Sequence, residues 1–127
     1  MAFRPSAYAP HALGILRIVT GLLFLEHGTQ KLFNFPERTM AKPELFSLFG
    51  VQGVIEIVGG ALVILGLFTR PVAFLLCGNM AVAYFMFHQP KNFYPAVNGG
   101  DASILFCFVF LYLCAAGPGA FSLDRRG

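Results

Sequence analysis

Apolar residues dominate four stretches of the chain, and short polar stretches rich in proline and glycine separate them. The apolar stretches cover approximately residues 12–34, 48–68, 71–88 and 101–117. A helix needs about 20 predominantly apolar residues to cross a bilayer, and each stretch is near that length. The pattern predicts an all-α protein, a four-helix transmembrane bundle that forms one membrane domain over residues 1–127.

Composition supports a membrane location. The 127 residues are 57% hydrophobic and 12% charged, with a mean hydropathy of +0.70, which is outside the usual range for a soluble domain. The net charge of +3 does not indicate a nucleic-acid partner, because the basic residues are spread along the chain and form no patch. The first apolar stretch is longer than the apolar part of a signal peptide, so we expect it to be retained as a span. The lipid bilayer is therefore the expected partner.

The connections predict the topology. The connection at residues 68–71 is so short that the second and third helices should be antiparallel neighbours. In the connection at residues 88–101, Asp101 is placed to cap the fourth helix. With four spans, the side that holds both termini carries Arg4, Arg70, Arg125 and Arg126, and the other side carries Lys31, Arg38, Lys42 and Lys91. We expect a bacterial inner (plasma) membrane protein with both termini in the cytoplasm.

Polar residues interrupt the first apolar stretch, where residues 24–33 read FLEHGTQKLF. At 100° per residue, these side chains occupy one half of the helix and leave the other half for lipid. This half carries Glu26, His27, Gln30 and Lys31, together with Arg17. Such segregation keeps ionisable groups out of the hydrocarbon and favours a bundle interior.

The second apolar stretch repeats this arrangement. Gln52 and Glu56 lie four residues apart on one face, beside Gly53 and Gly60, whose small size allows close helix approach. Glu26 and Glu56 each lie about eight residues, or about 12 Å, from the non-cytoplasmic end of their helices. The two carboxyls should therefore lie level with each other.

We predict a polar pocket among the four helices that opens toward the non-cytoplasmic side. Burial shifts the pKa of such groups and suits them to exchange protons. The candidate catalytic residues are Glu26, Glu56 and His27. The candidate ligand-binding residues are Arg17, Gln30, Lys31, Gln52, Asn79, His88 and Asp101.

Each candidate also has a structural interpretation. Lys31 and Arg17 would extend to the membrane surface as snorkelling side chains. Alternatively, Glu26 with Lys31 and Glu56 with Arg17 would form ion pairs that only fix the fold. Each histidine would serve as a hydrogen-bonded structural residue.

Metal and disulfide chemistry have weak support. The chain has no Glu-x-x-His pair of the kind that builds metal sites in helical bundles, so we predict no metal. Cys107 and Cys114 are seven residues apart, about 10.5 Å along a helix, which is too far for a disulfide. We expect these two cysteines and Cys77 to serve in packing.

Three segments of the chain resemble the successive signatures of the DoxX family of small bacterial membrane proteins. They are LRIVTGLLFLEHGTQKLF, GVIEIVGGALVILGLFTRPVA and NGGDASILFCFVFLYLCAAGPGAFSLD, within residues Leu13 to Asp124. The resemblance implies a four-helix fold and a link to quinol oxidation, thiosulfate:quinone chemistry or thiol and oxidant defence. It implies a component of a membrane oxidoreductase, with a quinone or a small sulfur compound as ligand, that associates with itself or with a larger membrane complex.

The resemblance supplies no settled catalytic residues, so the site residues rest on the polar pattern alone. One alternative function is a non-catalytic membrane scaffold or an accessory subunit of a redox complex. Another is a transporter of a small solute or proton, although four spans without broken helices are unlike a typical carrier.

Overall fold

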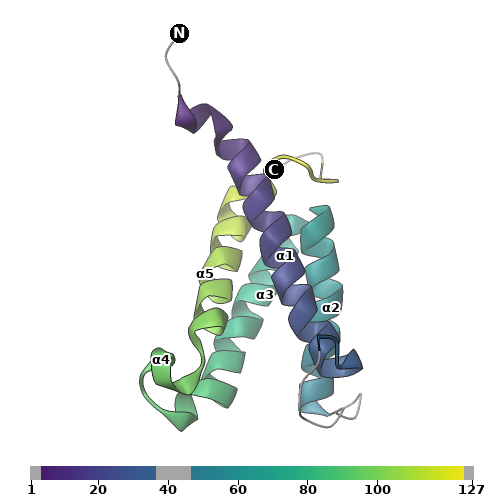
Figure 1. Ribbon diagram of the computed structural model, residues 1–127. Helices are drawn as coiled ribbons and strands as arrows, with labels where there is room; N and C mark the ends of the chain where they lie inside the picture. Colours follow the sequence, from purple (N-terminus) through teal and green to yellow (C-terminus); the bar gives the residue numbers. More distant parts are fainter. Residues whose placement is uncertain (1–3, 37–46, 125–127) are drawn as a thin grey trace.

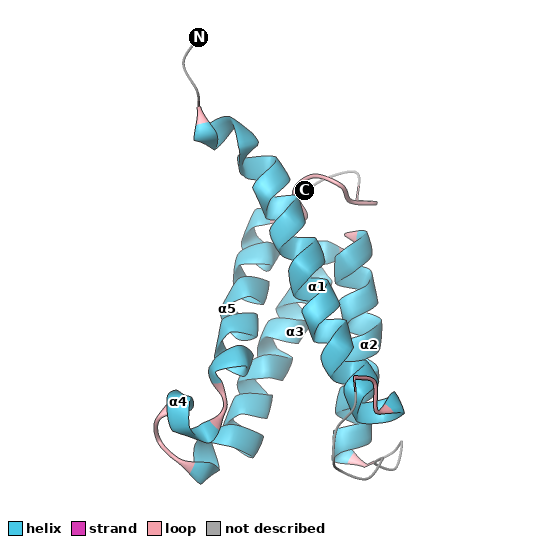
Figure 2. Ribbon diagram, viewed as in Figure 1, coloured by secondary structure: helices cyan, strands magenta, loops and turns pink. Residues whose placement is uncertain are grey.

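The computed structural model describes residues 4–36 and 47–124, and within them the chain is helical and contains no strand (Figures 1 and 2). The elements are η1 (Pro5–Tyr8), α1 (Ala9–Phe33), α2 (Leu48–Leu65), α3 (Thr69–Ala83), the π-helix η2 (Tyr84–His88), η3 (Gln89–Lys91), α4 (Pro95–Asn98) and α5 (Asp101–Ala116). The long helices α1, α2, α3 and α5 form the predicted four-helix transmembrane bundle.

The lengths of the helices match a bilayer. The continuous helical segments Pro5–Phe33, Leu48–Leu65 and Thr69–Lys91 are long and apolar enough to cross a membrane, and the 16 residues of Asp101–Ala116 form a shorter apolar helix. At 1.5 Å per residue, α5 is about 24 Å long. The lengths and composition of these helices are compatible with a multi-pass membrane protein.

Local sequence sets the ends of the helices. Ser47 begins α2 by accepting a hydrogen bond from the Gly50 backbone at 3.1 Å, and Gly66 ends it in the left-handed conformation with φ of 66°. The predicted cap of α5 is wrong by one residue. Gly100 occupies the N-cap, while Asp101 lies in the first turn, where its charge still complements the helix dipole.

Glycines bring α1 and α2 into close contact. A Cβ atom on Gly28 would lie 2.7 Å from the Gly53 carbonyl oxygen, and one on Gly21 would lie 3.0 Å from that of Gly60. We call Gly21, Gly28, Gly53 and Gly60 the glycine seam. The glycine seam confirms the close helix approach that the glycines of the second apolar stretch predict.

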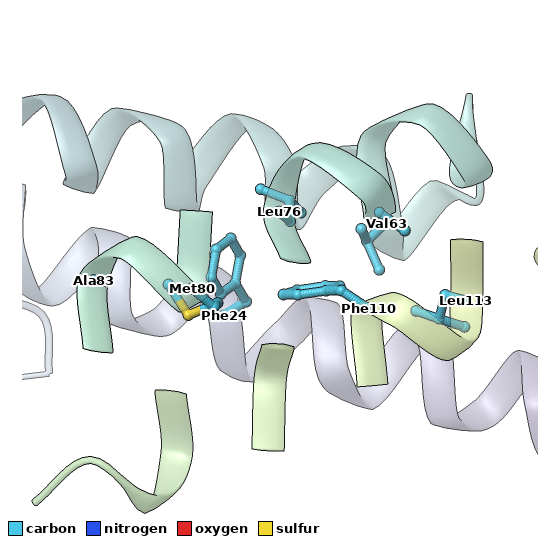
Figure 3. Close-up of a cluster of buried hydrophobic side chains, with 8 residues drawn as sticks. Phe24, Val63, Leu76, Met80, Ala83, Phe110 and Leu113 are labelled. Carbon is cyan, nitrogen blue, oxygen red and sulfur yellow. The ribbon is translucent and has the colours of Figure 1, made fainter. Parts of the chain in front are cut away.

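The bundle consists of two closely packed pairs, α1 with α2 and α3 with α5 (Figure 1). α2 and α3 are joined by a short turn, as expected, but each packs mainly on another helix. Phe24 of α1 joins the two pairs, because its ring makes edge-to-face contacts with Phe106 at 5.5 Å and Phe110 at 5.0 Å. The surrounding buried side chains are Val63, Ala73, Leu76, Met80, Ala83 and Leu113 (Figure 3).

Arg17 is buried at the end of the bundle where α1 begins, and it binds main-chain carbonyls. Its guanidinium donates to Val63 at 2.9 Å, to Ala120 at 3.0 Å and to Phe121 at 2.6 Å. It also donates to Pro118. The predicted ion pair with Glu56 and the predicted snorkelling of Arg17 are both wrong, since five donors in a planar fork let Arg17 satisfy several carbonyls at once.

The segment after α5 folds back over the turn between α2 and α3. The Asp124 carboxylate accepts hydrogen bonds from the Phe68 and Thr69 backbone N–H groups at 2.8 and 2.9 Å, and the Leu123 N–H donates to the Leu65 carbonyl at 2.9 Å. We call two sets of contacts the C-terminal clasp: those of Arg17 with the segment after α5, and those of Asp124 with the turn between α2 and α3. It places the start of α1 and the end of the described chain at the same end of the bundle (Figure 1).

The orientation in the membrane stays a prediction. Four of the charges on which it rests, Arg38, Lys42, Arg125 and Arg126, lie outside the described residues.

Candidate functional site

A cavity of about 200 Å³ lies between the two helix pairs, at the end of the bundle opposite the C-terminal clasp. Side chains of α1, α2, α3, η2 and α5 line it, so it exists only when the pairs come together. Its polar lining residues are His27, Lys31, Gln52, Glu56, His88 and Ser103, and its apolar and small lining residues are Phe49, Met80, Ala83, Phe87, Gly99, Ala102 and Phe106. Five of the ten predicted site residues therefore meet in one space.

Lys31 and Glu56 form an ion pair across α1 and α2. Lys31 Nζ lies 2.8 Å from Glu56 Oε1, and the two side chains are 16% and 5% exposed. The ammonium also lies 5.3 Å from the ring centre of Phe49, within range of a cation–π contact. The predicted pairing of Lys31 with Glu26 is wrong. Lys31 lies against α2 at Gly53, where an added Cβ would be 3.3 Å from the Lys31 Cβ, and its ammonium reaches Glu56 instead.

Amide groups extend this pair to α3. Gln52 Nε2 donates to Asn79 Oδ1 at 2.8 Å and Asn79 Nδ2 donates back to Gln52 Oε1 at 2.9 Å. Gln52 Nε2 also lies 3.3 Å from Glu56 Oε2. The polar chain Lys31–Glu56–Gln52–Asn79 thus connects three helices. Charges in a membrane interior are costly unless they pair, and this chain supplies partners for both.

His27 and His88 line the cavity from opposite helix pairs. His27 Nδ1 lies 2.7 Å from the Leu23 carbonyl oxygen, and its ring meets Phe106 edge to face at 5.7 Å. His88 Nδ1 lies 3.2 Å from the Asn98 carbonyl oxygen, and its ring stacks on Tyr84 at 6.3 Å. Both rings are therefore held in place by backbone and aromatic contacts.

The buried Asn98 fixes the loop that holds His88. Its Nδ2 group donates to the Tyr84 hydroxyl at 3.0 Å and to the Asn92 carbonyl at 2.9 Å, and its Oδ1 accepts from the Gly100 N–H at 2.8 Å. Asn98 thus supports the wall of the cavity through the loop on which it lies.

The other five predicted site residues do not line the cavity. Glu26 is exposed on α1, although it lies at a level similar to Glu56 because Gly28 opposes Gly53. Gln30 is half-buried, and Asp101 is exposed at the start of α5. Arg17 belongs to the C-terminal clasp, and Asn79 reaches the cavity only through Gln52.

Sequence reasoning missed the aromatic walls of the cavity and one cysteine contact. Phe49, Phe87 and Phe106 give no polar signal in an apolar chain, so their position appears only in the fold. Cys77 of α3 and Cys107 of α5 place their sulfur atoms 3.7 Å apart, which helical spacing within one stretch cannot reveal. Among residues 4–36 and 47–124, no three His, Cys, Asp or Glu side chains converge as a metal site.

Chemically, the cavity combines one carboxylate, one ammonium and two imidazoles with an apolar wall. Such groups can accept, donate and hold protons beside a ring or a small polar molecule. Comparison with known proteins places the chain in a family: the DoxX family model matches residues 12–89. The chain belongs to the DoxX family. The match covers α1, α2 and α3, which supply most of the residues around the cavity.

Curated relatives extend this DoxX match over most of the chain. A protein of Haemophilus influenzae described as uncharacterized is 43% identical over 94% of this chain and 92% of its own length. An uncharacterized membrane protein of Mycobacterium tuberculosis is 30% identical over 94% of this chain and 83% of its own. The inner membrane protein YphA of Escherichia coli is 31% identical over 94% and 93%. No solved structure matches the chain significantly.

Proposed function

We propose that this DoxX protein is the small-molecule-binding component of a membrane oxidoreductase system. The cavity carries the proposal: at membrane depth it joins the Lys31–Glu56 pair and two histidines to three phenylalanine rings. Redox reactions of quinones and small sulfur compounds move protons together with electrons, so they need proton carriers beside an apolar surface. Glu56 would exchange protons, Lys31 would balance its charge, and His27 and His88 would bind the ligand.

The environment of the protein is part of the proposal. YphA and a second Escherichia coli relative, YqjF, are described as inner membrane proteins, and we place this chain in the bacterial inner membrane with both termini in the cytoplasm. The cavity then lies toward the non-cytoplasmic side. Association with a second copy or with redox partner subunits would supply the electron donor or acceptor.

Native mass spectrometry of the purified chain in lipid nanodiscs tests the proposed function. We expect a bound quinone, its reduced form or a small sulfur compound, which is lost in Glu56→Gln protein that still folds. The matched control is Glu26→Gln, which removes the same charge from the exposed surface of α1 and should keep the ligand. If the folded wild type retains no small molecule and takes up none when quinones, hydroquinones or small thiols are added, the proposal is wrong.

A non-catalytic scaffold is the second candidate function. It is favoured by the polar chain Lys31–Glu56–Gln52–Asn79, whose members already satisfy one another. For a scaffold, the same native spectra would contain partner proteins without a small ligand.

A further inference from the structure

The two cavity histidines present the same ring nitrogen to the backbone. His27 Nδ1 and His88 Nδ1 each lie within hydrogen-bond distance of a carbonyl oxygen, at 2.7 and 3.2 Å. A carbonyl oxygen only accepts hydrogen bonds, so Nδ1 carries the proton in both rings. In a neutral imidazole, the other nitrogen, Nε2, is then an acceptor without a proton.

Neither Nε2 atom has a hydrogen-bond partner among the described residues. The Nδ1 atom of His27 faces the backbone of its own helix, so the opposite edge of the ring, with Nε2, points away from α1. The Nδ1 atom of His88 faces the Asn98 carbonyl, so its Nε2 lies on the ring edge that points away from that loop. Since both side chains line the cavity, two free acceptors are available to a ligand there.

With the charged groups included, the cavity lining offers more hydrogen-bond acceptors than donors. Glu56 contributes a carboxylate, which accepts from Lys31 and Gln52. The Lys31 ammonium is the charged donor of the cavity lining, and one of its N–H groups is already used by Glu56. A ligand that brings its own donors fits this arrangement better than one that offers only acceptors.

We infer that His27 and His88 determine specificity by selecting the hydroxyl form of the ligand over its carbonyl form. The inference rests on the proposed function of the cavity. A phenolic hydroxyl donates to Nε2, and its oxygen can still accept from Lys31. A quinone oxygen only accepts, so it would direct its lone pairs at those of Nε2. A thiol is a weaker donor, which disfavours small sulfur compounds.

The size and walls of the cavity suit one substituted aromatic ring. Its volume is about 200 Å³, and an apolar cavity of about 150 Å³ holds benzene in another protein. Phe49, Phe87 and Phe106 supply faces and edges for ring contacts. A single-ring diol therefore fits the cavity in both volume and polarity.

Binding of trimethylhydroquinone and its 1,4-dimethyl ether to the full chain in nanodiscs tests the inference. The two molecules share a ring, but the ether has no donor. Two hydrogen bonds of about 1 kcal/mol each correspond to at least about tenfold tighter binding of the diol. Equal or tighter binding of the ether would overturn the inference and leave a ligand-binding cavity. Failure of both rings to bind would also overturn the inference, and the proposed function would fail with it if the native spectra contain no small molecule.

Histidine variants and a spectroscopic readout complete the test. His27→Phe and His88→Phe should each lower the preference for the diol about fivefold, by the loss of one hydrogen bond. His11→Phe, at an exposed histidine outside the cavity, should keep the preference. Nitrogen-15 NMR of histidine-labelled protein reports the tautomer directly, whether or not the variants fold. We expect protonated Nδ1 and bare Nε2 in both cavity rings, and protonated Nε2 would contradict the inference.

Discussion

At the scale of single residues, the charges of this membrane protein are neutralised by two different means. Lys31 and Glu56 pair with each other at the cavity, whereas Arg17 uses main-chain carbonyls at the other end of the bundle. A paired charge depends on one partner, so its loss leaves the other charge buried. The charge of Arg17 is bound by several carbonyls, so its neutralisation depends on the fold of the segment after α5 that supplies most of them.

Removal of one partner from the Lys31–Glu56 pair should therefore lower the free energy of unfolding more than removal of both partners does. We expect Lys31→Met to lower the free energy of unfolding by about 3 kcal/mol, because Glu56 would stay buried without its cation. The double variant Lys31→Met, Glu56→Leu should recover most of that loss. Unfolding in mixed detergent micelles measures both, and an equal or larger loss in the double variant would contradict the pairing.

Asp124 gives the C-terminal clasp a dependence on pH. Burial raises the pKa of this carboxyl, but hydrogen bonds from Thr69 and Phe68 and the charge of Arg17 outweigh it, so the pKa lies below its ordinary value. A lowered pKa contributes stability that is fully present above the unfolded value of about 4 and is lost as pH falls through the folded value.

The stability difference between wild type and Asp124→Asn should follow this dependence. At pH 7 we expect Asp124→Asn to melt at a lower temperature than the wild type, and the gap should narrow once the pH falls below about 4. Thermal unfolding followed by circular dichroism at several pH values measures it. A gap that is constant from pH 7 to pH 3 would show that ionisation of Asp124 does not hold the clasp.

At the scale of the helices, the glycine seam determines which residues meet. Gly21 against Gly60 and Gly28 against Gly53 set the register of α1 on α2, and this register brings Lys31 to Glu56. The sequence predicted the polar and glycine stripes on each helix, because periodicity acts within one helix. The sequence did not predict the pairing of Lys31 with Glu56. The register between two helices depends on contacts between them, and the pattern along one helix does not contain these contacts.

The same reasoning explains the other misplaced residues. The partners of Arg17 are backbone carbonyls of the C-terminal segment, and backbone groups leave no signal in a sequence. Glu26 shares its half of the helical wheel with His27, but its side chain is exposed on α1. The four long helices could be predicted from apolar length alone, because a bilayer limits the chain to such segments.

Alanine at Gly28 should separate the two helices of the first pair. The new Cβ would lie 2.7 Å from the Gly53 carbonyl oxygen and 2.9 Å from the Ile57 backbone nitrogen, so backbone would have to move, at a cost of about 2 kcal/mol. Gly78→Ala on α3 is the matched control, because its Cβ would meet nothing within 4 Å. Equal free energies of unfolding for Gly28→Ala and Gly78→Ala would contradict close packing at the glycine seam.

At the scale of the whole molecule, the two helix pairs meet in the middle and differ at their ends. Phe24 and the buried cluster around it close the centre, the C-terminal clasp closes one end, and the cavity occupies the other. Variants at the clasp and the seam should change the stability of the bundle, and variants of the cavity histidines should change what the cavity holds. Lys31 and Glu56 belong to both groups, because their ion pair lies in the cavity wall and joins α1 to α2.

Photolabelling tests most directly that the cavity is the binding site of this DoxX protein. A hydroquinone that carries a diazirine would be activated on the chain in nanodiscs, and the labelled residues identified by peptide mass spectrometry. We predict labels on cavity residues such as Phe49 and Phe106, and their loss in His27→Phe or when excess trimethylhydroquinone is added. Labels confined to outward-facing residues such as Phe74, unaffected by that competitor, would contradict the account.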